Sequence, residues 1–506
     1  MRCVVFGATG YLGGRLVPEL LRAGHSVRVL ARTPGKLADT PWCEQVEIMR
    51  GDVTVERDVR AALADQQVLY YLVHSLTRSD FDEVDRRAAT LVAREAESAG
   101  VERIVYLGGI APAGQELSRH LSSRAEVGRI LLDGAVPALV FQAAVVIGSG
   151  SASFEMLRYL TERLPAMVTP RWVRSRIQPI AVRDVLYYLA RAAELPAAVT
   201  GAFDIGGPDV ITYEQMMREY AEVAGLPRRI IVPVPVLTPW LSAQWVNLVT
   251  PVPRAIAVPL MESLVNDVVC AEHEIADHIP DPDPGLIGYR RAVELALTRI
   301  RDLDVPTRWS DADPVGAEPS QPLPTDPEWS GGSLYQDLRE RPTSADQADL
   351  WAVIEAIGGE HGWYSFPLAW SLRGWLDRLA GGVGLRRGRR DPQRLREGDA
   401  LDWWRVERIE RPTLLRLRAE MRLPGRAWLE LCVGTGEHGA VYRQRAVFEP
   451  HGLAGHLYWK AIVPFHAVIF GGMTRNITGA AESATGRGAE RSVRARVGRL
   501  LGRRRK

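Results

Sequence analysis

The first 150 residues alternate short apolar runs with stretches of helical periodicity. The runs are rich in Val, Ile and Leu, which is typical of strands buried on both faces of a parallel sheet. They are Val4–Phe6, Val27–Leu30, Val46–Ile48, Val68–Val73, Ile104–Leu107 and Ala138–Gln142. The helical stretches are Leu12–Ala23, Asp82–Ala99 and Leu121–Leu132. This order predicts an α/β fold with a doubly wound parallel Rossmann sheet, and Ser151–Leu303 is expected to complete a smaller substrate subdomain.

A second pattern begins after residue 342. Ala348–Ile357 has helical periodicity, and four strand-like segments separated by turns follow it: Asp402–Arg408, Leu414–Met421, Ala427–Val433 and Val441–Phe448. An apolar helix is expected over Pro464–Ile477. The pattern predicts a C-terminal α+β domain in which a sheet wraps around a helix.

The length of 506 residues exceeds what one hydrophobic core supports. Pro306–Pro342 is rich in Pro, Asp, Ser and Gly, which indicates a linker. The predicted organisation is therefore a nucleotide-binding domain over 1–305, a linker over 306–342, the α+β domain over 343–484 and a basic tail over 485–506.

The motif Gly7-Ala-Thr-Gly10-Tyr-Leu-Gly13 follows the first strand directly and opens the first helix. In that position, glycines permit a tight turn, close approach of the backbone to a pyrophosphate and close packing of helix on strand. The motif therefore predicts a dinucleotide site. The residues expected to contact the cofactor there are Gly7, Thr9, Gly10, Tyr11, Leu12 and Gly13.

The residues after the second and third strands bear on the choice of cofactor. Arg32 stands where an NAD-preferring site usually has an acidic residue, and its guanidinium with Lys36 suits a 2′-phosphate. We expect NADP, with NAD as the alternative. Asp52 and Val53 are expected at the adenine, although Asp52 in a solvated turn and Arg32 as an ordinary surface residue are the alternatives.

These residues together resemble the atypical short-chain dehydrogenase/reductase superfamily, in its NmrA-like and complex-I-subunit-like branch. The resemblance covers about residues 1–300 and rests on the glycine motif, Asp52-Val53, Tyr106-Leu-Gly-Gly109, Ile177-Gln-Pro-Ile180-x-Val-x-Asp184 and Phe203-Asp-Ile-Gly-Gly207. The whole chain also resembles bacterial proteins that join such a domain to a C-terminal domain of unknown function. That domain is similar to helix-grip (SRPBCC-like) folds, which bind lipids and polyketides.

The resemblance implies a serine after the fifth strand and a Tyr-x-x-x-Lys pair on the next helix. The chain departs from both, because Gly108 and Gly109 replace the serine and His120-Leu-Ser-Ser-Arg124 replaces the pair. His120 is the candidate for proton transfer and Arg124 for holding the nicotinamide ribose, with Ser122 or Ser123 as alternative hydroxyls. His120 as a polar residue at an exposed helix start is the competing interpretation. His74 completes the predicted cofactor contacts.

Other patterns predict less. His273 and His278 are five residues apart and do not share a helix face, so no metal site is expected. The basic glycine-rich stretch Gly381–Arg390 lacks the ending of a P-loop and is expected to be a loop. Eight tryptophans of the C-terminal domain are either core or the lining of a ligand cavity: Trp351, Trp363, Trp370, Trp375, Trp403, Trp404, Trp428 and Trp459.

Charge and cysteine content restrict the partners and the compartment. The net charge is +2, which implies no attraction of the whole molecule to nucleic acid. Four scattered cysteines and an N-terminus that begins directly with a strand predict a cytoplasmic protein without a secretory signal. Ile230–Pro253 is uncharged but rich in proline, so an apolar lid or wall is expected rather than a membrane span.

The tail is the exception to this neutral balance. Arg487–Lys506 has nine basic residues and one acidic residue, with Val493, Val497, Leu500 and Leu501 on one helical stripe. A basic amphipathic helix in weak contact with the inner membrane surface is one expectation, and a solvated disordered tail is the alternative.

Taken together, the sequence predicts an NAD(P)H-dependent oxidoreductase that reduces a hydrophobic carbonyl or quinone-like small molecule. The alternative is a non-catalytic NADP(H)-binding sensor or scaffold, which the missing serine and Tyr-x-x-x-Lys pair favour. The sequence does not set the oligomeric state.

Overall fold

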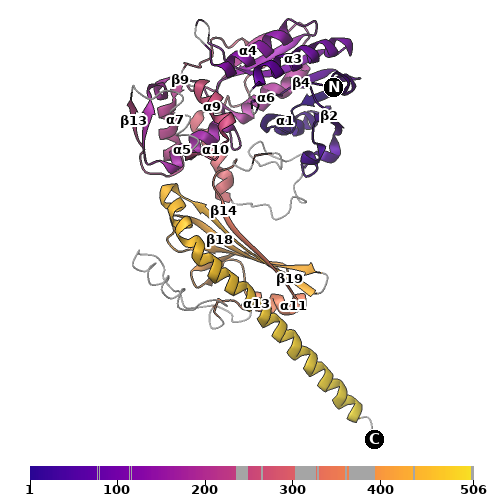
Figure 1. Ribbon diagram of the computed structural model, residues 1–506, viewed down its shortest axis with the longest axis vertical. Coiled ribbons are helices and arrows are strands. Elements are labelled where there is room, and N and C mark those ends of the chain that lie inside the picture. The colour runs from indigo at the N-terminus through magenta and orange to yellow at the C-terminus, as the bar shows by residue number, and fades with distance from the viewer. Residues whose placement is uncertain are drawn as a thin grey trace. The chain divides into compact units, whose positions relative to one another are not determined.

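The computed structural model describes residues 1–76, 78, 80–112, 114, 117–234, 249–263, 266–302, 326–327, 330–358, 362–363, 394–436 and 439–502. It divides into two compact units, Met1–Gly332 and Ser333–Lys506 (Figure 1). The predicted stretches around Trp370, Trp375 and Gly381–Arg390 lie outside the described residues, as does most of Ile230–Pro253.

The sheet of the first unit has the predicted Rossmann topology. Its strands are β1 (Arg2–Phe6), β2 (Ser26–Ala31), β3 (Glu47–Arg50), β4 (Val68–Tyr71), β5 (Arg103–Gly109), β6 (Ala138–Ala143) and β11 (Gly201–Ile205). Their order across the sheet is β11-β6-β5-β4-β1-β2-β3, and every pairing is parallel. From β1 the strand order extends to one side through β2 and β3, and to the other side through β4, β5, β6 and β11. In this fold the ligand crevice lies at the carboxyl ends of the strands beside such a reversal of strand order. The predicted fold class is confirmed.

Alternate residues of each strand enter two different cores, one on each face of the sheet. On one face, Val5 and Val29 pack with helices α1 (Tyr11–Arg22) and α6 (Val182–Arg191). On the other, Val4 and Phe6 pack with α2 (Glu56–Leu63), α3 (Phe81–Ser98) and α4 (Arg119–Leu132). Burial on both faces explains why the strands are continuously apolar in the sequence.

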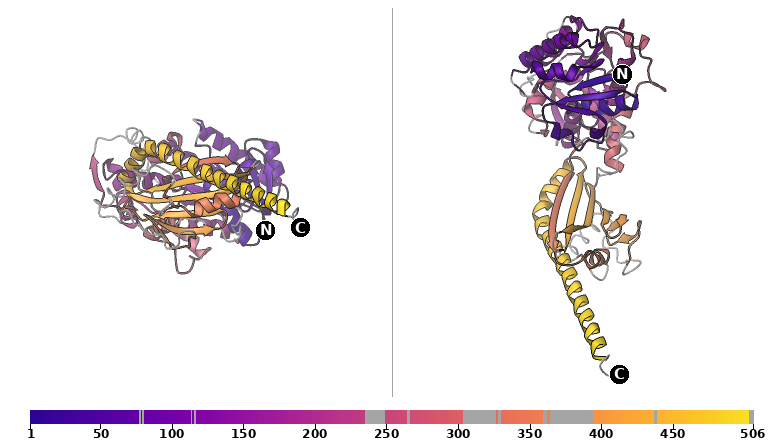
Figure 2. Two further views of the ribbon diagram at one scale, coloured as in Figure 1. Left: turned by 90° about the horizontal axis from the view of Figure 1, so that it is seen from below. Right: turned by 90° about the vertical axis from the view of Figure 1, so that its right-hand side faces the viewer.

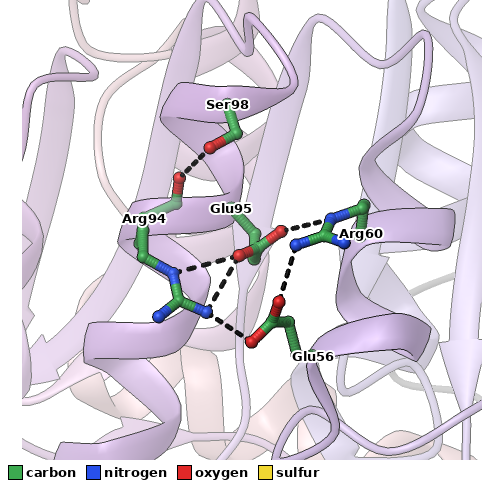
Figure 3. A network of polar contacts seen from close by, with 5 residues as sticks. All are labelled: Glu56, Arg60, Arg94, Glu95 and Ser98. Carbon is green, nitrogen blue, oxygen red and sulfur yellow. Dashed lines mark hydrogen bonds and ion pairs between the residues drawn. The ribbon is translucent and has the colours of Figure 1, made fainter.

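Figure 3 shows an ion-pair network that joins α2 to α3. The buried Glu95 carboxylate contacts Arg60 at 2.9 Å and Arg94 at 3.0 Å, and Glu56 contacts both arginines at 2.6 and 2.7 Å. The hydrogen bond from Arg60 and the neighbouring Arg94 charge lower the pKa of Glu95. The network holds the outer helices together on the sheet face away from α1.

A third core lies beside the carboxyl ends of β5 and β6. Phe154, Met216, Ala257 and Val293 are among its buried residues. Its helices are α5 (Ala152–Arg163), α7 (Tyr213–Val223), α9 (Arg254–Glu262) and α10 (Tyr289–Asp302). Its short strands pair two by two: β7 (Val146–Ile147) with β10 (Ile180–Ala181), β9 (Arg176–Ile177) with β12 (Ile211–Thr212), and β8 (Ala166–Pro170) with β13 (Ile230–Val234).

The second unit is a sheet crossed by a long helix (Figure 2). The antiparallel sheet has the order β14 (Tyr335–Thr343), β19 (Gly439–Pro450), β18 (Gly425–Gly436), β17 (Leu414–Ala419), β16 (Trp404–Glu410) and β15 (Ala400–Leu401). Helices α11 (Gln347–Glu355) and α13 (Gly452–Gly502) pack in one core with it. The six described tryptophans of the predicted set are all buried, which fits a core role. The helix-grip resemblance stays a prediction.

Two predicted boundaries are corrected. The predicted linker 306–342 ends in strand β14, and Asp326, Pro327 and residues 330–332 belong to the first unit. β14 is an edge strand and mostly polar, with Tyr335 and Leu338 as its large apolar residues, so the sequence shows no apolar run there. The final helix is not confined to Pro464–Ile477, because α13 begins at Gly452, contains Pro464 and continues to Gly502. Within the described residues, we find no helix with the length and hydropathy needed to cross a membrane.

Candidate dinucleotide and substrate pocket

The glycine turn between β1 and α1 has the geometry that a pyrophosphate site requires. Gly7 has φ +99°, and a Cβ there would be 2.6 Å from the carbonyl oxygen of Leu72. A Cβ on Gly13 would overlap the carbonyl of Gly7. Helix α1 then begins at Tyr11 with Gly10 as N-cap, and no side chain caps it. Its first N–H groups and dipole are thus available to an anion.

A pocket of about 390 Å³ opens at this turn. The end formed by the glycine turn is lined by Thr9, Gly10, Tyr11, Leu12 and Gly13. The carboxyl ends of β4 and β5 add His74, Gly108 and Gly109, and α4 adds His120 and Arg124. The structure therefore brings together eight of the predicted site residues: Thr9, Gly10, Tyr11, Leu12, Gly13, His74, His120 and Arg124.

Tyr11 is a further sign that the pocket accepts a polar ligand. The guanidinium of Arg15 lies over its ring at 4.2 Å, and the absence of side chains at Gly148 and Gly150 leaves space for the hydroxyl and the ring. The Tyr11 hydroxyl is buried and has no hydrogen-bond partner in the described chain. A buried hydroxyl without a partner costs free energy that a bound phosphate or ribose would recover. The residues present thus fit a dinucleotide.

Arg32, Lys36, Asp52 and Val53 do not line this pocket. Arg32 follows β2, Lys36 lies in the short helix Pro34–Leu37, and both side chains are exposed and form no ion pair with any described residue. Oδ1 of Asp52 accepts hydrogen bonds from the backbone and hydroxyl of Thr54, and Val53 packs against the core. Asp52 therefore has a structural role in its turn, and its predicted adenine contact stays a prediction.

His120 is half-buried at the start of α4. Its Nδ1 is 3.3 Å from the hydroxyl of Ser263, which follows α9. Burial and then the charges of Arg124 and His74 lower the pKa of His120 to about 3. The imidazole is therefore neutral at physiological pH, and its ring is partly buried rather than fully exposed.

Ser263 connects His120 to a second hydroxyl. Its Oγ is 2.8 Å from Oγ of Ser118 and donates to the carbonyl of Pro259 at 2.9 Å. Ser122 and Ser123, the hydroxyls proposed from sequence, do not line the pocket. Ser122 is exposed and Ser123 is buried on another side of α4. Sequence alone gave no signal for Ser263, because 143 residues separate it from His120.

Arg124 contributes a positive charge to the pocket. Its Nη2 donates to the carbonyl of Leu107 at 3.3 Å, and its guanidinium lies 5.5 Å from the centre of the Tyr106 ring. No carboxylate of the described residues forms an ion pair with it. The guanidinium is thus held in place by neutral groups and can bind a ribose hydroxyl or a developing oxyanion.

The opposite end of the pocket is apolar. Side chains from the third core line it, together with Val146 and Pro327: Val145, Val146, Ile177, Tyr213, Ile256, Leu260, Val268 and Pro327. Ile177, Tyr213 and Val268 are buried. This composition fits a hydrophobic molecule next to the glycine turn. Pro327 was missed from sequence because it lies within the predicted linker.

Comparison with known proteins agrees with this site. Residues 7–134 match the profile of a family described as NAD(P)H-binding, and residues 329–473 match DUF2867, a family of proteins of unknown function. Subunit 9 of the alpha subcomplex of mitochondrial NADH dehydrogenase [ubiquinone] from Arabidopsis thaliana is 24% identical over 311 residues, which are 57% of this chain and 77% of the relative. Ceramide reductase of Caulobacter vibrioides is 27% identical over 234 residues, which are 45% of this chain and 72% of that relative.

Among solved structures, the triphenylmethane reductase of Citrobacter sp. complexed with NADP(H) is 18% identical, with a TM-score of 0.48 over 59% of this chain and 100% of that one. The family match at residues 7–134 contains the glycine turn, His74, His120 and Arg124. It confirms the cofactor class expected from the turn. The N-terminal unit of this chain contains an NAD(P)H-binding domain, and the C-terminal unit contains a DUF2867 domain.

Proposed function

We propose that the chain is an NADPH-dependent reductase of a hydrophobic carbonyl or quinone-like molecule. The observation that carries the proposal is the pocket, which joins the glycine turn to an apolar chamber at one continuous site. A dinucleotide placed on the turn would direct its nicotinamide toward His120 and Arg124, beyond which the apolar residues begin. The relative named ceramide reductase is consistent with an apolar substrate.

The preference for NADPH rests on Arg32 and Lys36. Both are exposed cations without an ion pair among the described residues, at the end of the strand next to β1. An acidic side chain there would favour the ribose hydroxyl of NADH, whereas two cations favour a 2′-phosphate.

Reduction of a carbonyl needs one hydride and one proton, and the bound cofactor supplies the hydride. His120 cannot store the proton, because its pKa is about 3. A neutral imidazole can still relay one, by taking a proton at Nδ1 while releasing another from Nε2, once the Ser263 hydroxyl has turned from the carbonyl of Pro259 to Nδ1. The hydroxyls of Ser263 and Ser118 connect Nδ1 with the exterior of α4 at 3.3 and 2.8 Å. Arg124 stabilises negative charge on the substrate oxygen before the proton arrives.

A non-catalytic NADP(H)-binding sensor or scaffold is the second candidate. The low pKa of His120 and the two glycines in place of a catalytic serine favour it. This candidate predicts tight dinucleotide binding with no oxidation of the nicotinamide by any acceptor.

Calorimetric titration with NADPH, NADH and their oxidised forms tests the cofactor, and loss of reduced-nicotinamide absorbance with quinones, aromatic aldehydes and long-chain ketones tests the reaction. Arg32→Ala should weaken NADPH binding about tenfold or more and leave NADH binding unchanged. Arg87→Ala, an exposed arginine on α3, is the matched control. Binding without turnover supports the sensor, and no binding of any dinucleotide rejects both functions.

A further inference from the structure

Helix α13 of the second unit has two unlike faces. One face packs against the sheet and α11 through residues buried in the common core, among them Phe470, Met473, Ile477 and Ala481. Trp459 of α13 also faces the sheet, where its ring stacks on Tyr335 of β14 and Phe448 of β19. The ring centroids are 5.3 Å apart for Trp459 and Tyr335 and 5.7 Å apart for Trp459 and Phe448. Figures 1 and 2 show the helix crossing one face of the sheet and continuing beyond it.

The opposite face of the same helix is apolar and exposed. Leu457 is 59% exposed, Phe465 65% and Val468 57%, and Leu453 is exposed as well. Leu453, Leu457 and Val468 recur at spacings of four and eleven residues, which places them on one side of a helix. The exposed face of a helix packed on a sheet ordinarily carries polar side chains, so this stripe marks an interaction surface.

The charges that α13 itself carries along the stripe are positive. From His451 to Ala481 the sequence contains no Asp or Glu, and Lys460 and Arg475, the charged residues of this stretch, are both exposed. Further along the chain, residues 487–506 carry nine basic residues and one acidic residue. The helix therefore offers an apolar stripe with cations beside it and beyond it.

We propose that the exposed apolar stripe of α13, formed by Leu453, Leu457, Phe465 and Val468, docks on an anionic lipid bilayer, with the helix parallel to the membrane plane. Its apolar side chains would enter the boundary between headgroups and acyl chains, and Lys460 and Arg475 would face the lipid phosphates. A second copy of the chain is disfavoured, because pairing two such stripes would bring Lys460 and Arg475 of the two copies together, and the stretch from His451 to Ala481 has no acidic residue to pair with them. The bilayer supplies both an apolar phase and the opposite charge.

Flotation of the purified full chain with vesicles tests the proposal. Vesicles of phosphatidylcholine alone are compared with vesicles containing phosphatidylglycerol, at low and high salt. We expect binding to the anionic vesicles that weakens with salt. Combined Leu457→Ser, Phe465→Ser and Val468→Ser should lower the partition coefficient about tenfold or more. Lys460→Glu should lower it about severalfold at low salt, with a smaller effect at high salt.

Leu338→Ser is the matched control, because Leu338 is 62% exposed in the same unit but lies on β14. It should bind vesicles as the unsubstituted chain does. Near-ultraviolet circular dichroism and NADPH titration verify that each variant is folded. The proposal is overturned if the unsubstituted chain does not float with anionic vesicles, or if the triple variant floats equally well. It is also overturned if light scattering shows a dimer that the triple variant dissociates, because the stripe then belongs to a second copy.

Discussion

Arg15 and Asp326, 311 residues apart in the sequence, form a bidentate ion pair with both contacts at 2.7 Å. The side chains are only 2% and 6% exposed. Arg15 lies on α1 directly after the glycine turn, and Pro327, the neighbour of Asp326, lines the pocket. Close by, the N–H of Gly331 donates to the buried carboxylate of Glu155 at 3.0 Å. Asp326 and Gly331, which precede the second unit in the sequence, are therefore bound by side chains of α1 and α5.

The first prediction concerns this pair. Asp326→Asn leaves the buried Arg15 charge without its counter-ion, which should cost about 3 kcal/mol of local stability and weaken NADPH binding. Hydrogen exchange measured by mass spectrometry should accelerate in α1 and in residues 326–332. Glu19→Gln, which breaks the more exposed ion pair with Arg22 on the same helix, is the control and should leave both measurements unchanged. Unaltered exchange in Asp326→Asn would show that the pair is not what holds residues 326–332 in place.

The second prediction is that His120 stays neutral between pH 5 and 8. Its pKa of about 3 lies below the usual value of 6.5, so the unfolded chain takes up a proton that the folded chain does not. His120 therefore leaves the free energy of unfolding at its full value above about pH 6.5, and lowers it progressively as pH falls toward about 3. Long-range ¹H–¹⁵N spectra of the imidazoles, with His120→Gln for assignment, should show no titration of His120 in that range. A midpoint between pH 6 and 7 would contradict the prediction.

The third prediction separates proton relay from binding. Ser263→Ala removes the hydroxyl next to Nδ1 of His120, so kcat for carbonyl reduction should fall about 100-fold, while the Kd for NADPH stays unchanged. Ser122→Ala is the control, because Ser122 is exposed on α4 and does not line the pocket. Equal kcat for Ser263→Ala and the unsubstituted chain would remove the relay from the mechanism, without affecting the assignment of the dinucleotide site.

The sequence predicted what local chemistry determines and missed what long-range packing determines. The glycine turn was predicted because the backbone conformation at Gly7 and the close approach at Gly13 require glycine. The parallel strands were predicted because burial on both faces makes them continuously apolar. Ser263 and Asp326 were missed, since no local pattern indicates which helix a distant hydroxyl or carboxylate will contact. The sequence underestimates the length of α13, because Pro464 is typical of a helix start but lies inside the helix.

The last prediction tests the turn itself. A methyl group at Gly13 would overlap the backbone of Gly7, so Gly13→Ala must displace either α1 or the turn. The N–H groups at the start of α1 would then no longer converge on a phosphate, and NADPH affinity should fall about 100-fold, which corresponds to about 2.7 kcal/mol. Gly479→Ala is the matched control, because its added methyl also meets no atom within 4 Å and Gly479 lies on α13 of the second unit. Calorimetry measures both, with far-ultraviolet circular dichroism as a test of folding. If Gly13→Ala binds NADPH as tightly as Gly479→Ala does, the dinucleotide does not use this turn, and the pocket must be assigned to another ligand.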